Sequence, residues 1–337
     1  MLWHFYVHTD QFHKAALVQR GLATSRDFAI GLAQRIEYLS LAISNIKIAL
    51  DAARSGPQQP PPPQQQQQQQ APGGAAAAAA GPRSAADDGG DALTALRETE
   101  DQLEVAQVQL EIQQQVQAQG HAEVAGELDR LFTISELYER FAGPLQLWEA
   151  MLLIFRVANY DDPPLVLEVW TTILRSALDD AERTGLMAVA STVAALGPRL
   201  YPSPAFPLPQ LAELLAGLAR ERPQQYMPGF VTNALVQAGV PYGAVFRALN
   251  AMVAGRGGGS GAADDMLVRE VAALATAWVD AHGHQDVPDP SAAAPDALPV
   301  MEVDTALSQY IITSSLATNI ALKNELQHAQ GRLRKIL

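Results

Sequence analysis

The stretch LQLWEAMLLIFRVANYDDPPLVLEVWTTIL, residues Leu145–Leu174, decides the fold of this chain. It holds two Trp, one Phe, one Tyr and one Met, although aromatic residues make up only 6% of the 337-residue sequence. Apolar side chains recur at i, i+3, i+4 and i+7 in each half of the stretch, the spacing of one helical face. Between the halves, Asp162-Pro163 reads as a helix N-cap followed by Pro at the first helical position. The stretch therefore predicts a helical hairpin whose two apolar faces pack together.

These apolar side chains could line a ligand pocket or fill an ordinary core. A cofactor pocket needs a few convergent polar groups, and the stretch offers almost none. Burial of each large side chain instead contributes about 1.5–3 kcal/mol to folding. We therefore assign the following residues of the hairpin and of the segment before it to the structural core: Tyr138, Phe141, Trp148, Met151, Leu152, Phe155, Val166, Val169, Trp170 and Ile173.

The rest of the chain also predicts helices, because the alternating pattern of strands is nearly absent. Two long helices are expected over residues 28–50 and 91–119, from apolar residues at helical spacing: Ile36, Leu39, Ile43, Ile46 and Leu50 in the first, and Leu96, Leu103 and Leu110 in the second. The second helix carries a further apolar stripe beside the first one. This favours packing among neighbouring helices over the alternative, a free two-stranded coiled coil.

Three low-complexity segments interrupt the helices. Residues 54–91 contain PQQPPPPQQQQQQQAPGGAAAAAAGPR, and such tracts bury too little apolar surface to offset their ordering entropy, so we expect a disordered insertion. Residues 255–265 predict a flexible Gly-rich loop, and residues 282–299 an irregular, Pro-punctuated linker. Helices are then expected in the remaining ranges: 1–53, 92–254, 266–281 and 300–337.

Gly and Pro divide the helical ranges further. Gly143-Pro144, Gly197-Pro198 and Gly239-Val240-Pro241 each predict the end of a helix. The result is about ten helices joined by short breaks, without a compositional boundary between two globular domains. This predicts an all-α protein, an α-solenoid of stacked antiparallel helices with disordered low-complexity insertions. No fixed-period repeat supports one of the named repeat classes.

Composition excludes several classes of function. The formal net charge is -13, whereas nucleic-acid binding needs clustered Lys and Arg. The one basic cluster, Arg332, Arg334 and Lys335, is expected to complement the dipole of the last helix. There is no Cys, which excludes disulfides and thiolate sites. No apolar run is long enough for a membrane span and the first residues lack a basic n-region, so we expect a soluble intracellular protein.

The sequence offers little that could support catalysis. His4 and His8 stand at i, i+4 but lack a third ligand, so they are expected to be polar members of a half-buried helix rather than a metal site. Gly255–Gly261 lacks the Lys-Ser/Thr of a phosphate loop, and Asp264 and Asp265 follow it. We therefore expect no enzyme, no cofactor and no metal.

These residues resemble a known protein family. The segment ELYERFAGPLQLWEAMLLIFRVANYDDPPLVLEVWTTIL is similar to the C-terminal helical region of the large non-repetitive inner-ring scaffold nucleoporin of the nuclear pore complex. Three further segments resemble that family in its order: LAQRIEYLSLAISNIKIA, LRETEDQLEVAQVQLEIQQQV and AGVPYGAVFRAL. The family's N-terminal β-propeller and the longer solenoid before this region have no counterpart here, so we expect a C-terminal piece or a truncated gene product.

The resemblance implies a structural scaffold at the nuclear envelope that docks linker nucleoporins with disordered segments. It implies no direct contact with nucleic acid, membrane or a small-molecule substrate from this region. The candidate docking surface is formed by apolar residues near the C-terminus, although packing on the preceding helices is the interpretation we favour for them: Tyr310, Ile311, Ile312, Leu316 and Ile320. The competing function is a soluble helical adaptor or coregulator that recruits partners through its poly-Gln tract.

Overall fold

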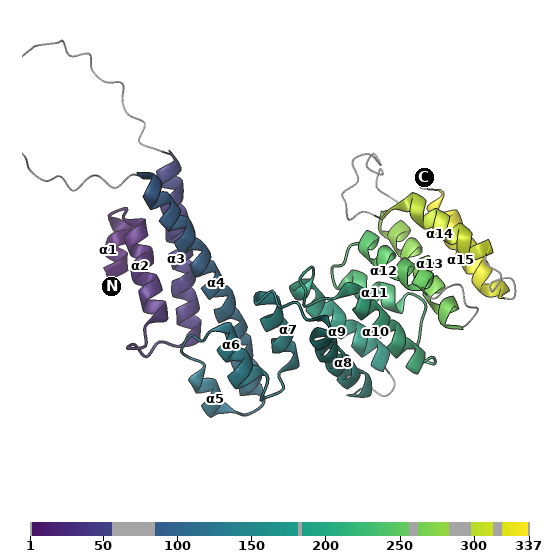
Figure 1. Ribbon diagram of the computed structural model, residues 1–337, viewed down its shortest axis with the longest axis horizontal. Helices are drawn as coiled ribbons and strands as arrows, with labels where there is room; N and C mark the ends of the chain where they lie inside the picture. Colours follow the sequence, from purple (N-terminus) through teal and green to yellow (C-terminus); the bar gives the residue numbers. More distant parts are fainter. Residues whose placement is uncertain are drawn as a thin grey trace, which may run out of the picture. The chain divides into compact units, whose positions relative to one another are not determined.

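The computed structural model describes residues 2–55, 85–180, 184–255, 262–282, 298–312 and 319–335. These residues form fifteen α-helices and one short π-helix, without a strand among them (Figure 1). They fall into two compact units, Met1–Glu139 and Arg140–Leu337, each of which is described by itself. The predicted all-α class is confirmed. The number of helices exceeds the prediction, because several are separated by turns of only a few residues, such as Thr9–Gln11.

The first unit is built on long helices that pack side by side. Its helices are α1 (Leu2–His8), α2 (Phe12–Thr24), α3 (Leu32–Ser55), α4 (Ala85–Ala118), α5 (Ala122–Glu127) and α6 (Ile134–Leu137). Helix α3 lies between α2 and α4 and packs on both, so α4 is part of a helical array and not a free coiled coil. Small side chains line the contacts, with Ala16 and Ala42 packed around Ile46.

Buried polar side chains hold the connecting loops of this unit. Arg35 is only 4% exposed and donates to the carbonyl oxygens of Ala23 at 2.5 Å, Ser25 at 2.8 Å and Asp129 at 2.8 Å. Burial lowers the pKa of this guanidinium against the opposing effect of the nearby Asp129 carboxylate. Gln109 donates to the Leu128 carbonyl at 2.7 Å. These hydrogen bonds satisfy backbone groups that the helices leave unpaired.

The second unit, Arg140–Leu337, begins within a π-helix at Tyr138–Ala142. Its helices are α7 (Trp148–Val157), α8 (Pro163–Asp180), α9 (Gly185–Leu200), α10 (Leu208–Glu221), α11 (Phe230–Gln237), α12 (Tyr242–Gly255), α13 (Ala262–His282), α14 (Val300–Ile312) and α15 (Ile320–Leu333). Asp162 caps α8 as predicted, since its Oδ1 accepts the Leu165 N–H at 3.4 Å. Helices α7 and α8 form the hairpin that the sequence indicates, and α9 packs on both.

The hairpin core centres on Trp170, which is fully buried. Its Nε1 donates to the Ala205 carbonyl at 2.9 Å, and Phe206 meets the ring edge-on with centroids 5.7 Å apart. Of the ten predicted core residues, Tyr138 and Trp148 are only half-buried and the other eight are buried. Helix α7 is buried over all of Ala150–Phe155, so neighbours cover it on more than the one face that its spacing indicated.

The predicted break at Gly197-Pro198 is wrong. Helix α9 runs through both residues to Leu200, because Pro198 sits in the last turn, where the missing N–H removes a single hydrogen bond. Gly197 has a packing role instead. A Cβ added there would overlap Ala238 Cβ and stand 2.7 Å from Ala238 Cα, so only glycine lets α9 approach the end of α11 this closely.

Two other helices begin earlier in the structure than the sequence predicts. Helix α4 begins at Ala85 and thus includes residues 85–91 of the predicted insertion. Helix α13 begins at Ala262, inside the predicted Gly-rich loop, and extends to His282. The expected disorder of residues 56–84 and the expected irregularity of 256–261 and 283–297 concern residues outside those described.

The basic cluster at the C-terminus has partners on neighbouring helices. Arg332 pairs with Asp280 of α13, and Arg334 Nε donates to Asp304 Oδ1 of α14 at 2.7 Å. Each arginine lowers the pKa of its partner carboxyl mainly through these hydrogen bonds. The expected dipole role thus gives way to ion pairs between helices.

Candidate functional site

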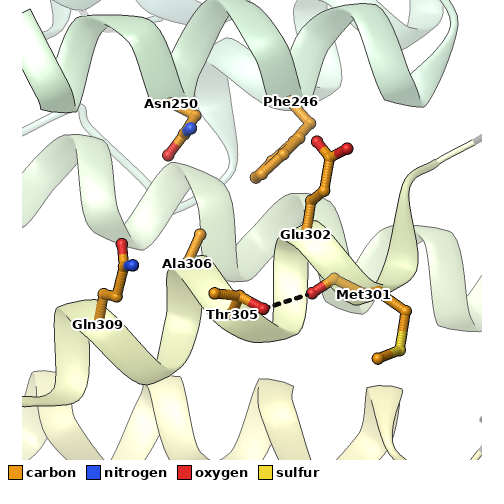
Figure 2. A pocket seen from close by; sticks show the side chains of 7 residues that line it. All are labelled: Phe246, Asn250, Met301, Glu302, Thr305, Ala306 and Gln309. Carbon is orange, nitrogen blue, oxygen red and sulfur yellow. Dashed lines mark hydrogen bonds between the residues drawn. The ribbon is translucent and has the colours of Figure 1, made fainter.

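A groove between α12 and α14 is the candidate functional site of the second unit. It has a volume of about 380 Å³ and is lined by Phe246 and Asn250 of α12 and by Met301, Glu302, Thr305, Ala306 and Gln309 of α14. Figure 2 shows Phe246 and Asn250 on one helix, opposite Glu302, Ala306 and Gln309 of α14, whereas the Met301 side chain points away from them. The site therefore depends on residues about fifty positions apart in the sequence.

The register of α14 explains why its side chains line a groove. Its buried residues are Val303, Ala306, Leu307 and Tyr310, which form the stripe that packs on the unit. The neighbouring stripe, with Met301, Thr305 and Gln309, is exposed and lines the groove. Ala306 lies where the two stripes meet, and its small side chain leaves room above the buried Phe246 ring.

One hydrogen bond fixes the polar end of the groove. The Tyr310 hydroxyl donates to Asn250 Oδ1 at 2.5 Å and so orients the amide. Desolvation raises the pKa of Tyr310 to about 12, so this hydroxyl is neutral and keeps its proton at physiological pH. At the other end, Glu302 is exposed and is the only charged side chain among the lining residues (Figure 2).

The structure separates the residues of the predicted docking surface. Tyr310 is 9% exposed and belongs to the core and to the wall behind Asn250, so it is not a surface residue. Ile311 is half-buried, whereas Ile312 and Ile320 are 81% and 70% exposed. Leu316 lies outside the described residues. Sequence reasoning missed the groove residues themselves, although the exposed Met301 and the polar positions beside an apolar stripe were visible signals.

A buried carboxylate elsewhere in this unit serves structure. Glu270 of α13 is fully buried, and its oxygens accept from Tyr226 Oη at 2.9 Å, Gly229 N at 3.0 Å and Thr232 N at 3.0 Å. Gly229 and Thr232 lie in the first turn of α11, so Glu270 caps that helix from a neighbouring one. Desolvation raises the pKa of Glu270 despite these hydrogen bonds.

The metal hypothesis gains no support from the described part of the chain. His4 and His8 lie on α1, and no group of three His, Asp or Glu side chains among the described residues is placed to hold a metal ion. Within the same residues, no helix combines the length and the apolar character that crossing a bilayer requires.

Stacked helical hairpins define a class of protein by its fold, the helical scaffold. The family model for the non-repetitive/WGA-negative nucleoporin C-terminal matches residues 1–70 and 75–321, and the chain belongs to this family. It is thus a helical scaffold segment of the nuclear pore complex in the nuclear envelope, and the predicted resemblance is confirmed.

Individual relatives agree with this family. The nuclear pore complex protein Nup154 of Drosophila melanogaster is 28% identical over 188 residues, which are 53% of this chain and 11% of that protein. A probable nucleoporin of Schizosaccharomyces pombe is 24% identical over 264 residues, or 74% of this chain and 17% of the relative. The chain thus spans less than a fifth of the length of these relatives.

Solved structures share the fold. The C-terminal domain of Nup170 from Chaetomium thermophilum superposes with a TM-score of 0.73 at 18% identity, covering 100% of this chain and 64% of that one. The complex of the same domain with Nup145N gives a TM-score of 0.65 at 20% identity, covering 98% of this chain and 63% of that one. The helical solenoid architecture is therefore common to both.

Proposed function

We propose that this chain is a non-catalytic scaffold of the inner ring that docks a short segment of a linker nucleoporin in the α12–α14 groove. The observation that carries the proposal is the groove itself, an apolar floor with a polar rim on a helical stack. Such grooves bind short linear segments by burying one or two apolar anchors while rim groups set the register. A related C-terminal domain, that of Nup170, forms a complex with Nup145N, which makes a nucleoporin segment the natural occupant.

The docking site proposed here replaces most of the C-terminal surface expected from the sequence. Tyr310 contributes by holding Asn250, whereas Ile312 and Ile320 remain exposed outside the lining. Pore assembly and nucleocytoplasmic transport would then depend on this chain as a passive support, whose rigid helices keep the groove in shape.

Titration calorimetry with a purified homologue of Nup145N tests the proposal. Met301→Glu places a charge on the rim of the groove and is expected to weaken binding by about tenfold or more, since an interfacial anchor is lost. Met187→Glu is the matched control, because Met187 of α9 is 63% exposed, close to the 68% of Met301, and lies outside the lining. Binding that is equal in the parent and both variants would reject the groove as the docking site.

A further inference from the structure

We infer that the α12–α14 groove selects a peptide segment in which a Lys or Arg stands within a few residues of a large apolar side chain. This inference rests on the proposed docking function and adds the chemistry of the segment. It follows from three parts of the groove that lie in order along it: a carboxylate at one end, an apolar floor, and an oriented amide at the other end (Figure 2).

The floor sets the apolar part of the motif. Phe246 and Ala306 are 2% and 6% exposed, so they offer a fixed surface below the groove, and the adaptable thioether chain of Met301 forms the rim. A volume of about 380 Å³ is at the small end of the range for binding pockets. It suits one or two side chains of a peptide and is too small for a whole helix face.

Glu302 sets the charge of the motif. It lies one helical turn before Ala306, and it is the only charged residue in the lining. No ion pair joins Glu302 to another residue in the described ranges, and its side chain is exposed at the rim of the groove. The net charge of -13 on the chain adds a long-range attraction for basic segments and a repulsion for acidic ones.

Asn250 offers a contact for the peptide backbone. Its Oδ1 accepts from the Tyr310 hydroxyl, and this bond directs the Nδ2 group to other acceptors. A backbone carbonyl of an extended peptide is such an acceptor, and an extended chain presents one at every residue. The groove thus offers one contact for the peptide backbone at the amide end and one for a basic side chain at the carboxylate end.

A peptide selection on the whole chain tests the inference. Phage-displayed random peptides are selected at low salt against the parent, Glu302→Lys and Glu168→Lys. Glu168 is an exposed carboxylate of α8 away from the groove, so the two variants change the net charge equally. The parent and Glu168→Lys are expected to enrich Lys or Arg near an apolar residue. Glu302→Lys is expected to lose that enrichment and to bind the selected peptides about tenfold more weakly, because close charge pairs carry this much coupling.

Two results would overturn the inference, and they differ in what they leave standing. Enrichment of apolar peptides without a basic residue, unaffected by Glu302→Lys, would reject the charge selection and leave the docking function in place. If the selected peptides all bind Met301→Glu as tightly as the parent, the groove is not the docking site. The proposed function then fails together with the inference.

Discussion

At the scale of single residues, Glu270 has the largest expected effect on the second unit. It is fully buried and caps α11 through the N–H groups of Gly229 and Thr232. Glu270→Ala leaves these donors and the Tyr226 hydroxyl unsatisfied in the core, so we expect a loss of about 3–5 kcal/mol. Amide hydrogen exchange of residues 230–237 measures this loss, because α11 without its cap opens more often and its amides exchange faster. Glu325→Ala is the control, since it removes only the exposed ion pair with Arg269. Equal exchange in both variants would contradict the capping role.

The same residue predicts a pH dependence. Desolvation raises the pKa of Glu270 in the folded state above its ordinary value of 4.5. The folded state therefore binds the proton more tightly than the unfolded one, and the associated stability is present at low pH and lost as the pH rises through the raised pKa. Glu270→Gln cannot titrate. The stability of the parent relative to this variant should increase as the pH falls from 7 toward 4.5, as measured by urea unfolding. A relative stability that falls over this range would show that the hydrogen bonds outweigh desolvation.

At the scale of elements, α15 is held by its apolar face more than by its ion pairs. Leu326 is fully buried, and Leu326→Ala is expected to destabilise the unit by about 2–5 kcal/mol through the cavity it leaves. Arg332 and Arg334 pair with Asp280 and Asp304 near the surface. Their joint replacement by Ala is expected to destabilise the unit less than Leu326→Ala does, and less still in high salt, because exposed ion pairs are screened. Thermal unfolding at two salt concentrations compares the variants. A larger loss for the arginines would contradict this ranking.

The elements also show which features a sequence can predict. The Asp162-Pro163 cap and the hairpin around Trp170 follow from residues close in sequence, so local spacing was sufficient. The α12–α14 groove could not be predicted, because it depends on how two helices meet that are separated in sequence by α13 and two low-complexity segments. The burial of Tyr310 agrees with the packing on preceding helices that the sequence favoured, whereas the exposure of its neighbour Ile312 does not.

Close packing also overrode local punctuation at Gly197-Pro198. The pair is typical of a helix end in sequence, but the helix continues because the contact with Ala238 requires glycine and Pro198 is near the terminus. The cap on α11 was equally hidden, since Glu270 reaches it from α13. Sequence patterns thus predicted the class of fold, while contacts between distant helices determined the site.

At the scale of the whole molecule, each of the two units has its own core, so we expect two unfolding transitions in urea. Circular dichroism follows both units. Tryptophan fluorescence follows mainly the second unit, which contains Trp148, Trp170 and Trp278 of the four Trp residues in the chain.

Variants in each unit assign the two transitions. Arg35→Ala in the first unit removes the donor to several buried carbonyl groups. It should reduce the free energy of unfolding of that unit by about 1.5–3 kcal/mol, which shifts the transition that circular dichroism detects and fluorescence does not. Gly197→Ala in the second unit forces a Cβ onto Ala238. It should reduce the free energy of unfolding of that unit by about 1–3 kcal/mol and shift the transition that fluorescence detects to lower urea concentration. Gly217→Ala is the matched control, because an added Cβ in α10 meets nothing within 4 Å and should stabilise the helix slightly. If Arg35→Ala and Gly197→Ala shift one common transition, the two units unfold together. The expectation that each unit unfolds independently is then wrong.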